Sequence, residues 1–198
     1  MLLIVFLISL FQSNSIEAAQ FIWTGGGADN LWDTPANWDL NSVPGGTDDV
    51  IFNSTSKDCY LSYNTSVEIM TFTSDYTGTF YSNSNLINII NNADYPTGGN
   101  IVFSPDDTIL LNGPVSQTLI SKQGIEFPQI KITNNVSIRI EGDHFRAVKI
   151  SIINGMCEMN TTFYLDSLNI GAGTQFISNE YEGIRDTLDV LEGYGSLD

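Results

Sequence analysis

The feature that most constrains the fold of this chain is a strand–turn–strand unit that recurs about every twenty residues. Between residues 130 and 176, short strands of alternating apolar and polar residues are separated by turns such as Asn134-Asn135, and the equivalent positions Ile132, Ile152 and Ile170 fall 20 and 18 residues apart. A single unit of this kind cannot bury its apolar side, but stacked units share one continuous core. The pattern therefore predicts an all-β solenoid.

The remainder of the chain also favours strands over helices. Its β-branched and aromatic segments are short and are separated by Asn, Gly, Ser and Asp, which is typical of an all-β protein. We interpret residues 70–72 with 79–80 as an earlier copy of the same unit, and residues 184–191 as a short amphipathic closing helix. A β-sandwich is the alternative architecture, because two hairpin spacings of a sandwich also give a period of about twenty residues.

Residues 19–52 differ in composition from everything that follows. All three tryptophans of the protein, Trp23, Trp32 and Trp38, lie here among glycines and two prolines. We expect this block to fold over the first coil as an N-terminal cap, because the end of a solenoid otherwise exposes its core and a free strand edge. The alternative is a sugar-binding platform, in which exposed indole faces stack on pyranose rings.

The same block carries a family resemblance. The spacing W-x-G, W, N-W, V-P-G and D-x-V-x-F resembles the opening module of secreted proteins in the autotransporter-associated β-strand repeat group, and it is similar to the start of amnionless-like ectodomains. The matching positions are Trp23, Gly25, Trp32, Asn37, Trp38, Val43, Pro44 and Asp49 to Phe52. The resemblance implies a right-handed parallel β-helix that serves as a surface or adhesion scaffold, with no catalytic residue. The chain lacks the many cysteines of the amnionless ectodomain, so receptor function is not inferred.

The first residues indicate secretion. Residues 2–11 are apolar apart from Ser9, and small residues follow at Ala18-Ala19. A run of this length is too short to span a bilayer and is typical of a signal peptide cleaved after Ala18, although a buried strand or a membrane anchor is an alternative. We expect a protein that is secreted and extracellular or held at the cell surface, with no transmembrane helix in the mature chain.

The charge of the mature chain limits its partners. Of the 23 acidic residues, Glu17 leaves with the signal, so 22 remain against 7 basic residues and the net charge is close to −15. Phosphate backbones and anionic membranes repel such a chain, which argues against nucleic acid as a partner. An extracellular protein or a glycan is the expected partner. Four N-x-S/T sequons, at Asn53, Asn64, Asn135 and Asn160, are candidate glycosylation sites on exposed turns.

The two cysteines, Cys59 and Cys157, are separated by 98 residues. At about 4.8 Å per coil, this separation corresponds to roughly five coils, which exceeds the Cα distance that a disulfide tolerates. We therefore predict that they do not bridge. Two buried thiols, or a bond to another chain, are the remaining hypotheses.

Little in the sequence indicates catalysis or a cofactor. The single histidine, His144, has no zinc-ligand or triad spacing around it, and we interpret it as a turn residue between coils. Carboxylate pairs such as Asp48-Asp49 and Asp106-Asp107 allow a weak calcium site, but the calcium-loop motif is missing. A carbohydrate-active enzyme that uses two carboxylates across a cleft stays as the least favoured hypothesis.

These observations give a division of the chain and an ordered set of functions. We expect a signal peptide at 1–18, the cap at 19–52, solenoid coils at 53–183 and, at 184–198, a tail or the start of a continuation. The favoured function is a non-catalytic structural or adhesion module. A carbohydrate-binding module that uses the three tryptophans is the second hypothesis, and a polysaccharide lyase or hydrolase is the third.

Overall fold

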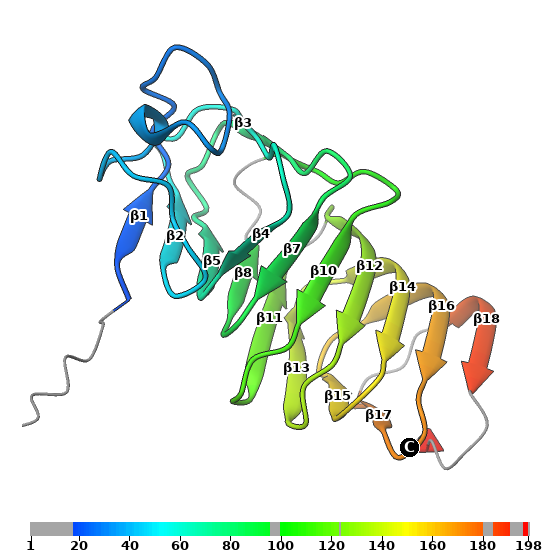
Figure 1. Cartoon of the computed structure of the whole chain (residues 1–198). Coiled ribbons are helices and arrows are strands. Elements are labelled where there is room, and N and C mark those ends of the chain that lie inside the picture. Colours follow the sequence, from blue (N-terminus) through cyan, green and yellow to red (C-terminus); the bar gives the residue numbers. More distant parts are fainter. Residues whose placement is uncertain (1–17, 96–99, 123, 180–183, 191–195, 198) are drawn as a thin grey trace, which may run out of the picture.

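A computed structural model describes residues 18–95, 100–122, 124–179, 184–190 and 196–197, with side chains to residue 179. The predicted signal peptide, residues 1–18, lies outside the described residues except for Ala18. Within these ranges, nineteen strands and one short 3-10 helix, η1 (Pro35–Asn37), make up the regular structure. Every pairing between named strands is parallel, so the chain is a β-solenoid and the β-sandwich alternative is wrong (Figure 1).

The strands form three sheets that run along the solenoid. The first sheet has nine strands: β1 (Gln20–Ile22), β2 (Asp49–Phe52), β5 (Ile69–Phe72), β8 (Ala93–Tyr95), β11 (Gln117–Ser121), β13 (Ser137–Gly142), β15 (Met156–Met159), β17 (Gln175–Ser178) and β19 (Ser196–Leu197). The second has seven: β4 (Thr65–Val67), β7 (Leu86–Ile89), β10 (Thr108–Leu111), β12 (Glu126–Ile132), β14 (Phe145–Ile152), β16 (Phe163–Ile170) and β18 (Ile184–Val190). The third has three: β3 (Cys59–Tyr60), β6 (Thr79–Tyr81) and β9 (Asn100–Val102).

The number of strands per coil changes along the chain. Early coils visit the first, third and second sheets in turn, as in β5, β6 and β7. After β11 the chain alternates between the first and second sheets only, and β12, β14 and β16 are seven or eight residues long. The third sheet therefore belongs to the N-terminal coils alone, and the long strands take its place farther along.

The predicted repeat register is confirmed. Ile132 pairs with Ile152, which pairs with Ile170, and all three side chains are buried. The same inward column continues toward the N-terminus through Leu111, Ile89 and Val67. Inward aromatic rings also stack from coil to coil, as in Phe52 on Phe72, with ring centroids 4.6 Å apart. The core is thus one uninterrupted apolar interior shared by neighbouring coils.

Two details of the sequence-based picture need correction, and the structure adds a third observation. Residues 70–72 lie on the first sheet, whereas residues 130–132 lie on the second, so the proposed early copy is out of phase with the later units. Residues 184–190 form the strand β18 rather than a closing helix. The predicted cap and tail also supply strands to the sheets, because β1 and β2 lie within 19–52 and β18 and β19 lie within 184–198.

Candidate binding surface

The three tryptophans are core side chains in this structure. Trp23 and Trp32 are fully buried and Trp38 is 2 % exposed, and their rings meet edge to face around Phe52 in the first coil. The indole nitrogen of Trp38 donates to the carbonyl oxygen of Trp32 at 2.7 Å. None of the three indole faces is open to a sugar ring, so their burial favours the packing role over the glycan platform.

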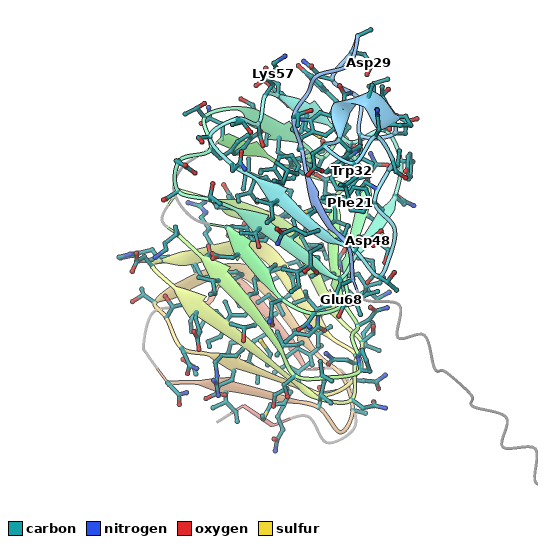
Figure 2. The ribbon with its side chains drawn as sticks, turned by 90° about the vertical axis from the view of Figure 1, so that its left-hand side faces the viewer. Phe21, Asp29, Trp32, Asp48, Lys57 and Glu68 are labelled. Carbon is teal, nitrogen blue, oxygen red and sulfur yellow. The ribbon has the colours of Figure 1, made fainter. Side chains whose placement is uncertain are left out.

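The loop that carries these tryptophans is held by Asn37, a buried polar residue. Its Oδ1 accepts a hydrogen bond from the Gly27 amide, and its Nδ2 donates to Asp29 Oδ1 and to the Leu31 carbonyl. Hydrogen bonds from the Leu31 amide, Thr34 and Asn37 lower the pKa of Asp29. The loop lies at the same end of the stack as β1 to β3 (Figure 1), and Figure 2 shows Asp29 and Lys57 at its outer side and Trp32 and Phe21 nearer the strands.

This loop is also attached to β3, so it extends the third sheet by one row. The Trp32 amide donates to the Tyr60 carbonyl, and the Tyr60 amide donates to the Asn30 carbonyl. Leu31 thereby pairs with Tyr60 as if it belonged to a further strand. Trp32 points into the core, and its neighbours Leu31 and Asp33 are exposed.

The outer side of the third sheet carries an aromatic and apolar column. Leu31, Tyr60, Tyr81 and Val102 occupy matching positions in successive rows. The rings of Tyr60 and Tyr81 are stacked, with centroids 4.5 Å apart and an interplanar angle of 4°. Leu31 is 41 % exposed and Val102 is 46 % exposed, while the two tyrosines are partly exposed.

Two carboxylates flank this column. Asp33 accepts a hydrogen bond from Ser62, and Asp58 accepts one from the Thr79 amide in the neighbouring row. Partial burial, together with Tyr81 and Asp58, raises the pKa of Tyr60. Partial burial, and to a smaller extent the charge of Asp33, raises the pKa of Tyr63. We call Leu31, Asp33, Asp58, Tyr60, Tyr81 and Val102 the tyrosine face. The sequence-based interpretation did not include this face, whose one signal in the sequence is the 21-residue spacing of Tyr60 and Tyr81.

One member of each carboxylate pair proposed for calcium accepts hydrogen bonds from the protein itself. Asp107 is buried, and its oxygens accept hydrogen bonds from Ser82, Ser104 and Asn85. Asp48 accepts from the amides of Ala19 and Gly45. Within the described ranges, no group of three or more His, Cys, Asp or Glu side chains is arranged to hold a metal ion.

The remaining candidates for chemistry are the single histidine and the carboxylates beside it in the sequence. His144 is exposed in the turn between β13 and β14, where it adopts a positive φ of 48°, as expected for a turn residue. The nearby Glu141 faces Arg139 at 3.6 Å. A concavity of about 430 Å³ at a corner of the later coils is lined by residues without a titratable side chain: Asn135, Val136, Ser137, Gly155, Met156, Gly173, Thr174 and Gln175.

The asparagines of the four sequons all lie outside the strands, in connections between them. Asn64 and Asn135 are exposed, whereas Asn53 and Asn160 are partly buried. Asn53, Asn64 and Asn160 each accept a hydrogen bond through Oδ1, whereas N-glycosylation modifies Nδ2. The asparagines thus lie on connections, two of them exposed as expected, and their glycosylation stays a prediction.

Cys59 and Cys157 are buried free thiols on different sheets, Cys59 on β3 and Cys157 on β15. Cys59 pairs with Phe80, and Cys157 pairs with Ile138 and Phe176. The coils between them keep the two sulfurs apart, as the coil spacing predicted. Burial raises the pKa of Cys59 well above its ordinary value and that of Cys157 to about 12.

We expect both thiols to be unreactive toward a disulfide reagent at pH 8 and to react fully after denaturation in guanidinium.

The burial of the two thiols also makes the stability of the fold sensitive to alkaline pH. Because an unfolded thiol has a pKa of about 8.5, the unfolded chain releases its protons first as the pH rises. The free energy of unfolding should therefore fall by up to about 1.4 kcal/mol per pH unit for each thiol above this value. Urea unfolding at a series of pH values measures the slope, and a flat profile from pH 8 to 11 would contradict the burial.

The helix η1 has only three residues, and none of the described helices could cross a membrane. The chain was compared with family models, with curated proteins and with solved structures, and none of them matches. The function of the tyrosine face is therefore inferred from its side chains, their exposure and their charge.

Proposed function

We propose that the chain is a secreted, non-catalytic adhesion module that binds its partner through the tyrosine face. The observation that supports this proposal is the exposed column of Leu31, Tyr60, Tyr81 and Val102 on a stack of parallel strands. Tyrosine is enriched at protein interfaces because its ring contributes apolar contact area and its hydroxyl contributes a polar one. A solenoid holds such side chains in fixed register, so little conformational freedom is lost when a partner binds.

The N-terminal sequence and the turn sequons support the extracellular part of the proposal. The apolar run at residues 2–11 would direct the chain into the secretory pathway, with cleavage after Ala18. Glycans at the corners would leave the sheet faces uncovered, because the asparagines of all four sequons lie between strands. The partner would then meet the flat side of the third sheet rather than a glycosylated turn.

Expression of the full chain with a C-terminal tag in a glycosylating cell line tests this function. We expect the secreted protein to begin at Ala19, to lose mass on enzymatic deglycosylation and to adhere to intact cells or matrix. A variant with Tyr60→Ser and Tyr81→Ser should be secreted equally well but adhere less. Retention inside the cell with an intact N-terminus, or adhesion that the double substitution does not reduce, would overturn the proposal. Release of sugars from a polysaccharide panel would instead indicate an enzyme.

A further inference from the structure

The N-terminal coils carry an excess of negative charge that their own residues do not neutralise. Residues 19–121 contain 11 acidic residues and 1 basic residue, Lys57, which gives a net charge of −10. The ammonium group of Lys57 donates to the Gly25 carbonyl at 2.9 Å. Among the described residues, neither Asp33 nor Asp58 forms an ion pair.

In the later coils, several outward carboxylates are neutralised by basic side chains, unlike those of the N-terminal coils. Outward carboxylates there have cations in neighbouring rows, as in Arg146 and Glu126 at 3.0 Å and Arg139 and Glu158 at 3.5 Å. Six of the seven basic residues of the chain lie between residues 122 and 185. A cationic partner therefore meets the larger excess of uncompensated charge at the N-terminal end, where one basic residue stands against eleven acidic ones.

The tyrosine face also has the right chemistry for the side chains of lysine and arginine. Their aliphatic stems pack on apolar surface while their charged ends stay in water or reach a carboxylate. The column from Leu31 to Val102 covers three strand spacings of about 4.8 Å, or roughly 14 Å, which an extended segment of about four residues can span. Asp33 and Asp58 lie beside the Leu31 and Tyr60 end of this column, within the same rows.

We infer that the tyrosine face binds a lysine- or arginine-rich segment of a partner protein. The aliphatic stems lie on the column of Leu31, Tyr60, Tyr81 and Val102, and the charged ends pair with Asp33 and Asp58. This inference rests on the proposed adhesion function and deepens it, because it names the class of partner. A neutral glycan is the less favoured occupant, since stacking on a sugar makes no use of the two unpaired carboxylates.

The test uses the full secreted chain and fluorescent peptides of equal length that alternate Arg with Ala or Glu with Ala. Fluorescence anisotropy should show binding of the Arg peptide, with weaker binding at higher salt, and no binding of the Glu peptide. The variant with Asp33→Asn and Asp58→Asn keeps both hydrogen-bond acceptors and removes two charges. We expect it to bind the Arg peptide about tenfold more weakly.

A matched control separates this face from the overall charge of the chain. Asp39→Asn with Asp94→Asn also removes two charges, but Asp39 bonds to the amide of Ile22 in β1, and Asp94 lies in β8 of the first sheet. We expect this control to weaken binding less than about twofold. Equal losses in both double variants would overturn the inference, because they would show only non-specific attraction to a polyanion.

Two further outcomes distinguish this inference from the proposed function. Adhesion to cells that depends on Tyr60 and Tyr81, without any affinity for the Arg peptide, would overturn the basic partner and leave the adhesion function standing. Binding of neutral glycans that depends on Tyr60 and Tyr81 would also overturn the basic partner and leave the adhesion function standing. Specific binding of the Arg peptide by a chain that is never secreted would support the face and overturn the adhesion function.

Discussion

Replacing Gly142 by Ala should lower the free energy of unfolding by about 3–5 kcal/mol, which is a large part of the stability of a domain this size. Gly142 lies at the end of β13 with a φ of +116°, a conformation that L side chains rarely adopt. A Cβ there would overlap the carbonyl oxygen of Ser121 in the preceding coil. The substitution thus adds backbone strain to a direct clash between neighbouring coils, each worth about 1–3 kcal/mol.

The matched control for this substitution is Gly124→Ala. Gly124 has a similar φ of +100°, but no atom lies within 4 Å of the position that its Cβ would occupy. We expect a loss of only about 1 kcal/mol, from backbone strain alone. Urea unfolding followed by circular dichroism measures both variants. Equal losses for Gly142 and Gly124 would show that the two coils do not approach each other as closely as the structure places them.

Truncation of Trp38 to Ala should destabilise the protein by about 3–5 kcal/mol. Its ring lies 5.0 Å from that of Trp23 and 4.7 Å from that of Trp32, so removal leaves a cavity at the start of the stack. The substitution also leaves the Trp32 carbonyl without the indole donor. Trp38→Phe keeps most of the volume and should cost less, about 1–3 kcal/mol.

Leu40→Ala serves as the control, because this neighbouring side chain is 51 % exposed and its loss should change stability by less than about 0.5 kcal/mol. Chemical denaturation of the three variants supplies the comparison. If Trp38→Ala were as stable as Leu40→Ala, the tryptophan block would not be part of the core, and a role in sugar binding would regain support.

The architecture could be predicted from the second half of the chain because its strands are long enough to show their periodicity. Alternation in residues 130–132 and 136–140 identifies the inward positions, and the spacing of Ile132, Ile152 and Ile170 identifies the repeat. The first half lacks this signal, since β3 has two residues and β6 and β9 have three. Strands this short show no alternation, so the three-sided shape of the early coils could not be predicted.

The error at residues 184–190 has a specific cause. Ile184 pairs with Leu165 and Leu188 pairs with Leu168, but a register shift adds one residue to β18 between these pairs. The two apolar residues are therefore four positions apart in the sequence, which imitates the spacing of an amphipathic helix. A bulge of this kind is invisible in a single sequence.

The tyrosine face could have been found from the repeat, although it was not. Tyr60 follows Cys59 and Tyr81 follows Phe80, at positions 21 residues apart, close to the period of the solenoid. The placement of Leu31 in the same column could not have been predicted. This placement depends on the buried side chain of Asn37, which holds the loop in shape. No sequence motif predicts that such a loop pairs with β3.

All of these interpretations require that successive coils pair in parallel and in register, and cysteine cross-linking measures this directly. Gln129 pairs with Lys149 in the next coil, and Lys149 pairs with Ser167 in the coil after that. Mild oxidation should link Gln129→Cys to Lys149→Cys quickly, because neighbouring strands lie about 4.8 Å apart. Gln129→Cys with Ser167→Cys, two strands apart, should stay reduced. Failure of the first pair to link, with linking instead of Lys131→Cys to Ser137→Cys across the Asn134-Asn135 turn, would show a hairpin and contradict the solenoid.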